Sequence, residues 1–560
     1  MKPRHRDGAV AVWWVVFFAL VPSMCAQEAP APRHTGVPQD WSQHHIVFSR
    51  DALARHPDLI YREPRILHQA MQRWQAPNSD VFHGAAARPV SANNSGHHRD
   101  WSVKLEGRLI ANMFPAKFSF DAGAPPSCTN DYVVFGLAIA GVTGGHPNLV
   151  AFNNLYSDPV SGGGFCDPPL GPGLTVLFAY NITTATGGKI VTSPILSEDG
   201  SKIAFVESLG TSAVFHVLTW TAGQGTLAAA AAPTAMTSLT FSTNADSTTS
   251  SPWIDYSNDI VYLGADNGVV NQITGVFKGT PTLTAGSPWP VAVGTEHLTP
   301  PVLDSGRGLL MVGSADGNLY QINTSTGALA TLRVGKQGGT GAGIMAAPIV
   351  DVTNDTTFVV SANGGSSAVL VEVKTSKMVQ HSLAEIGQGA SGGATTPPVQ
   401  LYEPAFSNDY FNDPSTGLIT LCGTGASDTT PYQYAFGFTG TGMHESNVAG
   451  FPKQLSTSTT DRCTGWTEFF NPNLGAAPGT DFFFFGLTDD CTELGSGITN
   501  GCVVAIGVNG SSTTTTAAPV DGGPSGIVVD NYSTAEQAAS IYLMADTLDT
   551  AYKFTQNGLK

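Results

Sequence analysis

The chain has 560 residues, a formal net charge of −17, only 12% charged residues and 63 glycines. An acidic surface repels the phosphates of nucleic acids and anionic lipids, so we expect neither as a partner. The length exceeds an ordinary domain of roughly 100–200 residues, although large all-β folds exceed that size as single units.

The sequence of residues 1–26 is typical of an export signal. Basic residues precede an apolar stretch over residues 8–22, which is shorter than the ~20 residues that a membrane-spanning helix needs. A cleavage site follows around Cys25 and Ala26. We therefore expect a secreted or periplasmic protein with no membrane span after cleavage. An uncleaved anchor and a lipoprotein modified at Cys25 are the alternatives.

Residues 27–100 form a leader that contains more than half of the 14 histidines. A short helix is expected over residues 64–75, because Pro64 suits a first helical position and apolar residues recur on one face. The pairs His44-His45 and His97-His98 are candidate metal ligands. No His-x-x-x-His pair or acidic cluster supports them, so we predict a mostly irregular leader with solvated histidines.

Residues 101–560 carry a recurring unit: a small residue and proline, an apolar pair, a polar turn and an apolar strand. Continuous apolar runs such as Phe482–Phe485 are typical of strands buried on both faces. Spacings of roughly 50–80 residues suit a four-stranded propeller blade with loop insertions. We predict an all-β fold, a β-propeller of eight four-stranded blades, with seven blades as the alternative. The copies are marked by residues 115, 194, 252, 301, 348, 398, 468 and 526.

The two ends of this repeat region complement each other. Residues 101–105 precede the first copy, and the last run, Thr550–Phe554, lacks a fourth strand. We predict that residues 101–105 form the outer strand of the final blade, which removes an open seam. A β-sandwich with a second β domain is the rival architecture, and it does not explain the repeat.

Six cysteines remain after Cys25, and an even number in an oxidising compartment indicates three disulfides. In a propeller blade the first and third turns lie on one face, while the second turn and the blade-to-blade connection lie on the other. Assigning each cysteine to its turn predicts the pairs Cys128–Cys166, Cys422–Cys463 and Cys491–Cys502.

The segment Val312–Gly327 contains a strand, an Asp-Gly hairpin turn, a second strand and a Thr-Gly turn. It resembles the repeat of quinoprotein-type (PQQ-like) propellers, and Ser197–Ile203 is similar to the blade repeat of TolB-type periplasmic propellers. The resemblance is specific over about residues 190–365 and implies a fold rather than a function.

Quinoproteins hold their cofactor between a tryptophan and a ring of adjacent cysteines, with calcium on acidic and amide side chains. This chain has no adjacent cysteines, and Ala328–Leu332 follows the Thr-Gly turn where that family has a tryptophan. We therefore expect no quinone cofactor. The acidic loops Asp255–Asp259 and Asp351–Asp355 are calcium candidates that we interpret as turns. Trp253 lies on a predicted innermost strand. Because such strands line the central channel, we single it out as an aromatic residue of the channel.

The leading hypothesis is a secreted, non-catalytic binding or scaffold protein that engages an unknown protein or glycan through loops on one face. One alternative is an enzyme that uses the central funnel, either a degenerate quinoprotein dehydrogenase or a hydrolase or lyase. Another is an accessory for outer-membrane assembly or export. We assign no catalytic, cofactor-binding or metal-binding residue, and we expect a monomer.

Overall fold

The computed structural model divides into two units, Met1–His34 and Thr35–Lys560. It describes Met1, residues 36–48, 63–73 and 97–556, except 111, 121–125, 170, 244–247, 337–342, 390–400, 441, 473, 477 and 531–536. The predicted export signal lies, apart from Met1, outside the described residues. In the described part of the chain, no helix has the length and apolar character to cross a membrane. Every helix and strand of the described residues belongs to the unit Thr35–Lys560.

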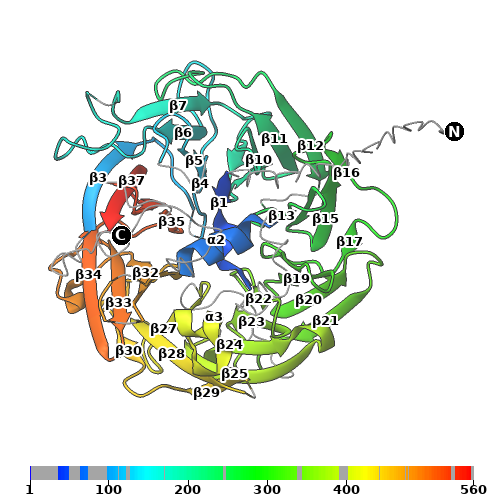
Figure 1. Cartoon of the computed structure of the whole chain (residues 1–560). Helices are drawn as coiled ribbons and strands as arrows, with labels where there is room; N and C mark the ends of the chain where they lie inside the picture. Colours follow the sequence, from blue (N-terminus) through cyan, green and yellow to red (C-terminus); the bar gives the residue numbers. More distant parts are fainter. Residues whose placement is uncertain are drawn as a thin grey trace. The chain divides into compact units, whose positions relative to one another are not determined.

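Eight antiparallel sheets surround a central channel, as predicted (Figure 1). In each blade the strands are named a to d from the channel outwards. Blade one consists of β4 (Ala116–Ser119), β5 (Tyr132–Gly136), β6 (Leu149–Asn153) and β7 (Thr175–Tyr180), and blade two of β9 (Ile195–Leu196), β10 (Lys202–Ser208), β11 (Ala213–Thr219) and β12 (Met236–Ser242), with β8 (Lys189–Ile190) paired to β10. Blade three consists of β13 (Trp253–Asp255), β14 (Ile260–Gly264) and β15 (Val269–Thr274), with β16 (Thr282–Leu283) and β17 (Val291–Ala292) both paired to β15 as its outer strand. Blade four consists of β18 (Val302–Asp304), β19 (Leu309–Gly313), β20 (Asn318–Asn323) and β21 (Leu329–Arg333).

The remaining blades complete the ring. Blade five consists of β22 (Ile349–Asp351), β23 (Thr356–Ser361), β24 (Ser367–Lys374) and β25 (Val379–Gln388). Blade six consists of β26 (Ala405–Phe406), β27 (Leu418–Thr424), β28 (Pro431–Thr439) and β29 (Gly442–Asn447), with β30 (Lys453–Gln454) paired to β28. Blade seven consists of β31 (Thr467–Asn471), β32 (Thr480–Leu487), β33 (Cys502–Asn509) and β34 (Ser512–Pro519), and blade eight of β35 (Val528–Asp530), β36 (Ser540–Met544), β37 (Thr550–Gln556) and β3 (His97–Lys104). Short helices, η3 (Thr375–Lys377), α3 (Asn408–Asn412), η4 (Pro414–Thr416) and η5 (Thr492–Leu494), lie in the turns.

The b and c strands are buried because blades stack face to face, which explains their unbroken apolar sequences. Every residue of β32 is buried. The predicted a-strand marker Pro398 lies outside the described residues, and the innermost strand of that blade is β26, several residues later. The other markers fall on, or within a few residues of, their innermost strands.

The predicted ring closure is confirmed. Strand β3 pairs antiparallel with β37, with Trp101 opposite Lys553 and Lys104 opposite Thr550. The strand begins at His97, so it is longer than predicted and starts inside the leader. Blade eight therefore takes its outer strand from the N-terminal side of the chain and its other three strands from the C-terminal end.

A hydroxyl just before the innermost strand recurs in several blades. It lies two or three residues before the a-strand or its proline and accepts a hydrogen bond from a backbone N–H of the b strand in the same blade. This contact satisfies a buried donor and fixes the blade connection against the b strand. The acceptor–donor pairs are Thr192–Val206, Ser250–Gly264, Thr299–Gly313, Thr464–Gly486 and Ser525–Met544.

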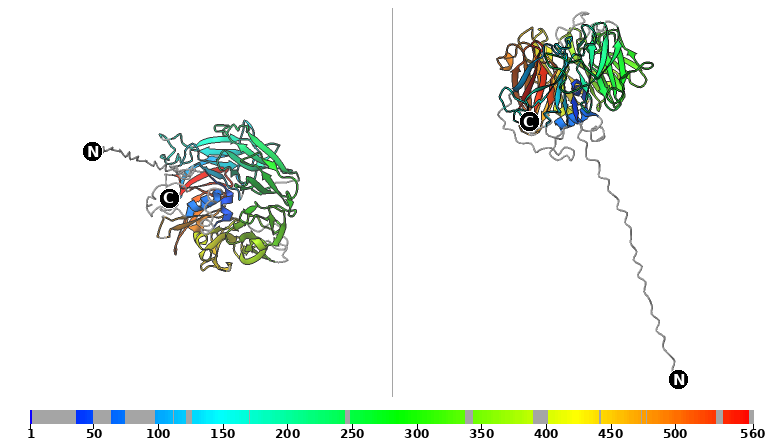
Figure 2. Two further views of the ribbon diagram at one scale, coloured as in Figure 1. Left: turned by 45° about the vertical axis from the view of Figure 1, so that its right-hand side comes forward. Right: turned by 90° about the horizontal axis from the view of Figure 1, so that it is seen from above.

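The leader differs from its prediction. Its described segments β1 (Val37–Gln39), η1 (Trp41–His44), β2 (Ile46–Val47) and α2 (Pro64–Arg73) occupy the centre of the ring, and we call them the N-terminal plug (Figures 1 and 2). Strand β1 pairs antiparallel with β4, and β2 pairs parallel with β22. The interpretation of solvated histidines is wrong for His45 and His68, which are buried. The reason is that plug side chains fill the space that the ring of inner strands leaves open.

Candidate functional site

The plug is fastened to blade three through Trp253. The Trp41 indole packs edge-on against Trp253 with ring centroids 5.6 Å apart, and its Nε1 donates to the Pro252 carbonyl at 3.1 Å. The fully buried Arg65 guanidinium lies 4.1 Å from the Trp253 ring centroid and donates to the Ile254 carbonyl at 3.0 Å. Trp253 thus holds the chain's own leader within the channel, by aromatic and cation–π contacts.

An ion pair holds the C-terminal end of α2 against blade seven. Arg73 donates to both carboxylate oxygens of Glu468, with a distance of 2.6 Å to Oε1, and its guanidinium carbon lies 3.3 Å from the Phe411 ring centroid. Burial, followed by repulsion from Glu468, raises the pKa of Asp481 well above its usual range. Burial thus disfavours the charged form of Asp481, and Arg73 places its positive charge directly against Glu468.

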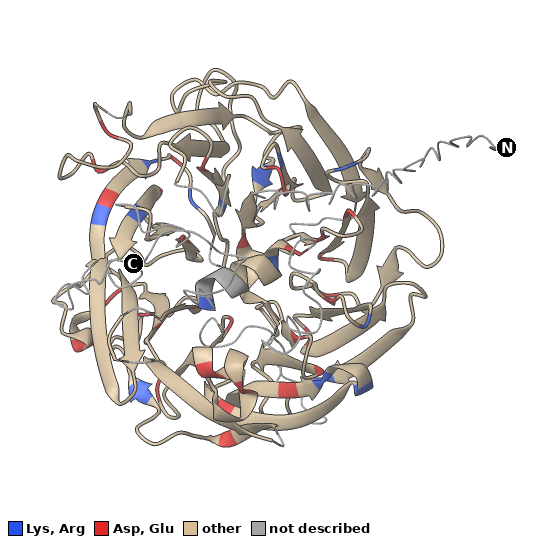
Figure 3. Ribbon diagram, in the orientation of Figure 1, with Lys and Arg blue, Asp and Glu red and all other residues tan. Residues whose placement is uncertain are grey.

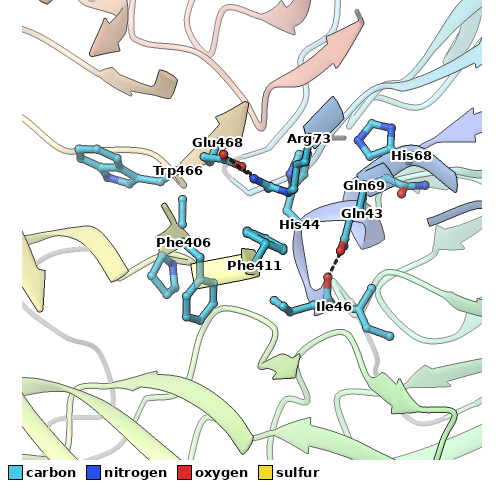
Figure 4. Close-up of a pocket in the computed structure, with 13 residues that line it drawn as sticks. Gln43, His44, Ile46, His68, Gln69, Arg73, Phe406, Phe411, Trp466 and Glu468 are labelled. Carbon is cyan, nitrogen blue, oxygen red and sulfur yellow. Dashed lines mark hydrogen bonds and ion pairs between the residues drawn. The ribbon is translucent and has the colours of Figure 1, made fainter. Parts of the chain in front are cut away.

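A small cavity remains beside these groups (Figure 4). Its volume is about 30 Å³, which accommodates about one water molecule and no organic cofactor. Burial is the main cause that lowers the pKa of His44 to about 3 and that of His45 to about 4. Burial likewise lowers the pKa of His68, so the imidazoles of the plug are neutral at pH 7. The lining consists of Gln43, His44, Ile46, Val47, His68, Gln69, Arg73, Pro404, Ala405, Phe406, Phe411, Trp466 and Glu468.

A polar contact lies between the blade connections that precede blades one and six. The Asn112 amide nitrogen, with the amide oriented to satisfy both partners, lies 2.8 and 3.2 Å from the carboxylate oxygens of Glu403. Burial raises the pKa of Glu403 to about 7. A carboxyl that titrates near neutrality is a common feature of active sites. Here, however, it is 1% exposed and is enclosed by the connections themselves.

The acidic loops that were calcium candidates use their carboxylates within their own turns. Asp255 Oδ1 accepts from the backbone N–H groups of Ser257 and Asn258 at 3.1 and 3.2 Å. Asp351 Oδ1 accepts from Thr353 and Asn354 at 2.9 Å. These contacts fit the interpretation of the loops as turns.

The structure pairs the cysteines as the sequence predicted, Cys128 with Cys166, Cys422 with Cys463 and Cys491 with Cys502. The first bond ties the a–b turn of blade one to the c–d loop of the same blade. The other two lie on the opposite face, one across the connection between blades six and seven and one around the b–c turn of blade seven. Three disulfides indicate an oxidising compartment.

A larger concavity lies on the circumference of the ring, between the outer strands β25 and β29 of blades five and six. Its volume is about 640 Å³, and we call it the outer groove. Glu372 joins its walls, because its Oε2 accepts from the Met443 N–H at 2.8 Å and lies 3.2 Å from His381 Nδ1. The lining residues are His381, Ser382, Thr439, Gly442, Met443, His444, Glu445, Ser446, Asn447 and Val448.

Sequence reasoning missed Arg65, Arg73, Glu403, Glu468 and the outer groove. Arg65 and Arg73 lie eight residues apart on a helix expected to be a solvated part of the leader, so nothing marked them as buried. Arg65 pairs with Glu63 close by in the chain, but its aromatic partner Trp253 and both partners of Arg73, Glu468 and Phe411, belong to distant blades. The only hint of this site in the sequence was the adjacent pair His44-His45, because the leader is unusually rich in histidine.

No family model matches the chain, and no curated protein matches it. Solved structures similar to the chain include BamB from Moraxella catarrhalis, at 15% identity and a TM-score of 0.38, over 82% of this chain and 97% of that one. A computationally designed protein, Ika8, matches at 12% identity and a TM-score of 0.44, over 82% and 100%. The WD40 domain of Toxoplasma gondii coronin matches at 12% and 0.34, over 70% and 85%. The strand pairing itself shows the eight-bladed propeller.

Proposed function

We propose that this protein is an exported, non-catalytic binding propeller that engages a protein partner through the outer groove and the turns beside it. The observation that carries the proposal is the contrast between two spaces. The channel holds the N-terminal plug, and the cavity described between the plug and blades six and seven has about 30 Å³, whereas the outer groove offers about 640 Å³. The groove volume is within the range of ~300–1,000 Å³ that ligand sites in proteins occupy.

The lining of the outer groove favours a peptide over a sugar. Among the described residues that line it there is no tryptophan, tyrosine or phenylalanine, the side chains that present a flat apolar face to a planar or ring-shaped ligand. It offers hydroxyl, amide, imidazole and carboxylate groups instead. Its walls are outer strands of two blades, and such strands bind extended peptides by adding them to a sheet edge.

The charges around the groove indicate a partner of mixed or basic character. His444 and Glu445 are exposed, and both acidic and basic residues are spread around the ring, with basic residues also on the central helix α2 (Figure 3). The formal net charge of −17 makes a basic segment of the partner favourable and steers its approach.

The three disulfides and the basic, then apolar, start of the sequence support export. Rigid loops held by disulfides are a suitable frame for binding, because little conformational entropy is lost when a partner binds. The resemblance to PQQ-like and TolB-type repeats agrees with a periplasmic or secreted propeller. A quinone cofactor has no place in this proposal, because the plug occupies the channel.

Partner capture with a groove variant tests the proposal. The change Ser446→Arg places a bulky cation in the outer groove, and Thr331→Arg makes the same change on an exposed part of β21 in blade four. We expect crosslinking mass spectrometry on secreted or periplasmic fractions to identify a protein joined to β25 or β29. The affinity of that protein falls at least tenfold with S446R and is unchanged with T331R.

Three results contradict the proposal. One is a partner whose affinity responds equally to both variants, and a second is selective binding on a glycan array. The third is stoichiometric binding of pyrroloquinoline quinone with calcium, followed by dye-linked oxidation of alcohols or aldoses, which establishes the enzyme alternative.

A further inference from the structure

A histidine and two aspartates converge where the closing strand β3 meets the c–d loop of blade one. His98, Asp100 and Asp158 each place one ligand atom within 4.8 Å of the other two, and no other group of this kind occurs among the residues that the structure describes. His98 Nε2 lies 2.9 Å from Asp158 Oδ2 and 3.8 Å from Asp100 Oδ1. With bonds of ~2.1 Å, a tetrahedral ion separates its ligand atoms by roughly 3.4 Å, and these two distances bracket that separation.

One oxygen of this cluster has no hydrogen-bond donor in the described structure. Asp100 is fully buried, and its Oδ1 accepts no hydrogen bond in the described structure. Its other oxygen, Oδ2, accepts from Lys553 Nζ and from Thr555 Oγ1, the latter at 2.6 Å. A buried carboxylate oxygen without a donor is unfavourable, and an ion or water that fills its position explains such an atom. The oxygen lies on the side of Asp100 that faces His98.

Neighbouring groups hold the three side chains in place. Asp158 Oδ1 accepts from the Ser161 N–H at 2.9 Å, and the Asp158 N–H donates to Asp167 at 2.7 Å. The loop that carries them is fixed by the disulfide Cys128–Cys166. Outer contacts of this kind fix the orientation of metal ligands and strengthen their binding. The His98 side chain is 43% exposed, which leaves a path for an ion from solvent.

We propose that His98, Asp100 and Asp158 bind a divalent transition-metal ion, for which Zn²⁺ is the probe. One imidazole nitrogen and two carboxylate oxygens match the ligands of zinc, and calcium requires six to eight oxygens. Ser161 Oγ, 3.3 Å from His98 Nε2, or a water completes the coordination. The ion takes the place of the direct contact between His98 Nε2 and Asp158 Oδ2.

The position of the site gives it a structural role. His98 and Asp100 belong to β3, the strand that closes blade eight, and Asp158 belongs to blade one. A bound ion joins the first and last blades at the one seam of the ring where the two ends of the repeat region meet. Because the complete site exists only in the closed ring, the ion stabilises the folded protein by an amount that grows with the logarithm of its free concentration once that exceeds the dissociation constant.

Titration calorimetry and thermal unfolding with ZnCl₂, on the full exported chain after treatment with a chelator, test the proposal. We expect a tight Zn²⁺ site and a melting temperature that rises with Zn²⁺. His98→Gln and Asp158→Asn, which keep the size of the side chains, reduce the affinity of that site at least tenfold and abolish the rise. His297→Ala is the control, because the largely exposed His297 forms an ion pair with Asp266 at 3.0 Å elsewhere on the ring.

Cobalt(II) supplies an independent readout. We expect visible absorption bands of Co²⁺ bound to nitrogen and oxygen, lost in H98Q and D158N and retained in H297A. Equal Zn²⁺ affinity in H98Q and the unmodified protein overturns the proposal, since it assigns binding to the other histidines. A melting temperature that does not respond to Zn²⁺, or responds to Ca²⁺ alone, also overturns it.

Discussion

Lys117 and Asp530 form a fully buried ion pair between blades one and eight, with Lys117 Nζ 2.8 Å from Asp530 Oδ2. Tyr156 lies beside the pair, accepts from Lys117 at 3.2 Å and donates to Asp131 at 2.6 Å. Burial raises the pKa of Asp530, and Lys117 opposes this shift. The pair joins the innermost strands of the first and last blades, as β3 joins their outer parts.

Removing one partner of this pair leaves a buried charge. We predict that Lys117→Met lowers the free energy of unfolding by about 3–5 kcal/mol. The double variant K117M/D530N, in which neither side chain is charged, recovers much of that loss. Denaturant unfolding of the three proteins at pH 7 measures both effects, and a double variant no more stable than K117M argues against a buried pair.

The plug is expected to contribute to stability through Trp41. Trp41→Ala removes the contact with Trp253 and the hydrogen bond to Pro252, and we predict a loss of about 3–5 kcal/mol in the free energy of unfolding. Trp220→Ala, which truncates a partly exposed indole on blade two, is the control and costs less. Equal or greater destabilisation by W220A would show that the leader is not packed in the channel.

Glu403 makes the stability depend on pH. Its pKa is raised to about 7 from 4.5, so the stabilisation is fully present below pH 4.5 and is lost as the pH rises through 7. We predict that Glu403→Gln, which stays neutral and can still accept from Asn112, stabilises the protein at pH 8 by up to roughly 3 kcal/mol. The two proteins have equal stability at pH 4. Unfolding midpoints across this range check the difference, and a constant difference at all pH values contradicts it.

His45 makes the stability depend on pH in the opposite direction. Burial lowers its pKa from 6.5 to about 4, so its contribution is present above pH 6.5 and is lost as the pH falls through 4. The unfolded chain binds the proton first, and the plug loosens in acid. We predict that His45→Gln flattens the decline in stability between pH 6.5 and 4, by up to roughly 3 kcal/mol at the acid end. If the decline in stability between pH 6.5 and 4 is unchanged in His45→Gln, the imidazole of His45 is exposed to solvent and not buried.

The disulfides are open to a direct chemical check. Peptide mapping without reductant should recover Cys128 with Cys166, Cys422 with Cys463 and Cys491 with Cys502. Each bond contributes roughly 2–4 kcal/mol, mainly by restricting the unfolded chain. Any other pairing would contradict both the blade order and the loop that carries Asp158.

Repetition explains which features were predictable from sequence. The blades recur as similar units, so the inner-strand markers, the strand over residues 101–105 and the turns that carry cysteines followed from counting along the chain. The plug consists of strands of two and three residues, the 3-10 helix η1 and the helix α2. The apolar pattern predicted α2, but the other elements are too short to show a periodicity, and nothing in the pattern placed α2 in the channel. Arg73 and Glu468 are separated by 395 residues, so only the closed ring brings them together.

Hydrogen–deuterium exchange of the segments 36–48 and 63–73 is the most direct test that the N-terminal plug fills the channel. We predict slow exchange for both segments, comparable with that of the neighbouring β22, because their backbone is buried and hydrogen-bonded within the ring. Complete exchange at the earliest time point, with β22 still protected, would mean that the channel is open, and it would contradict the account.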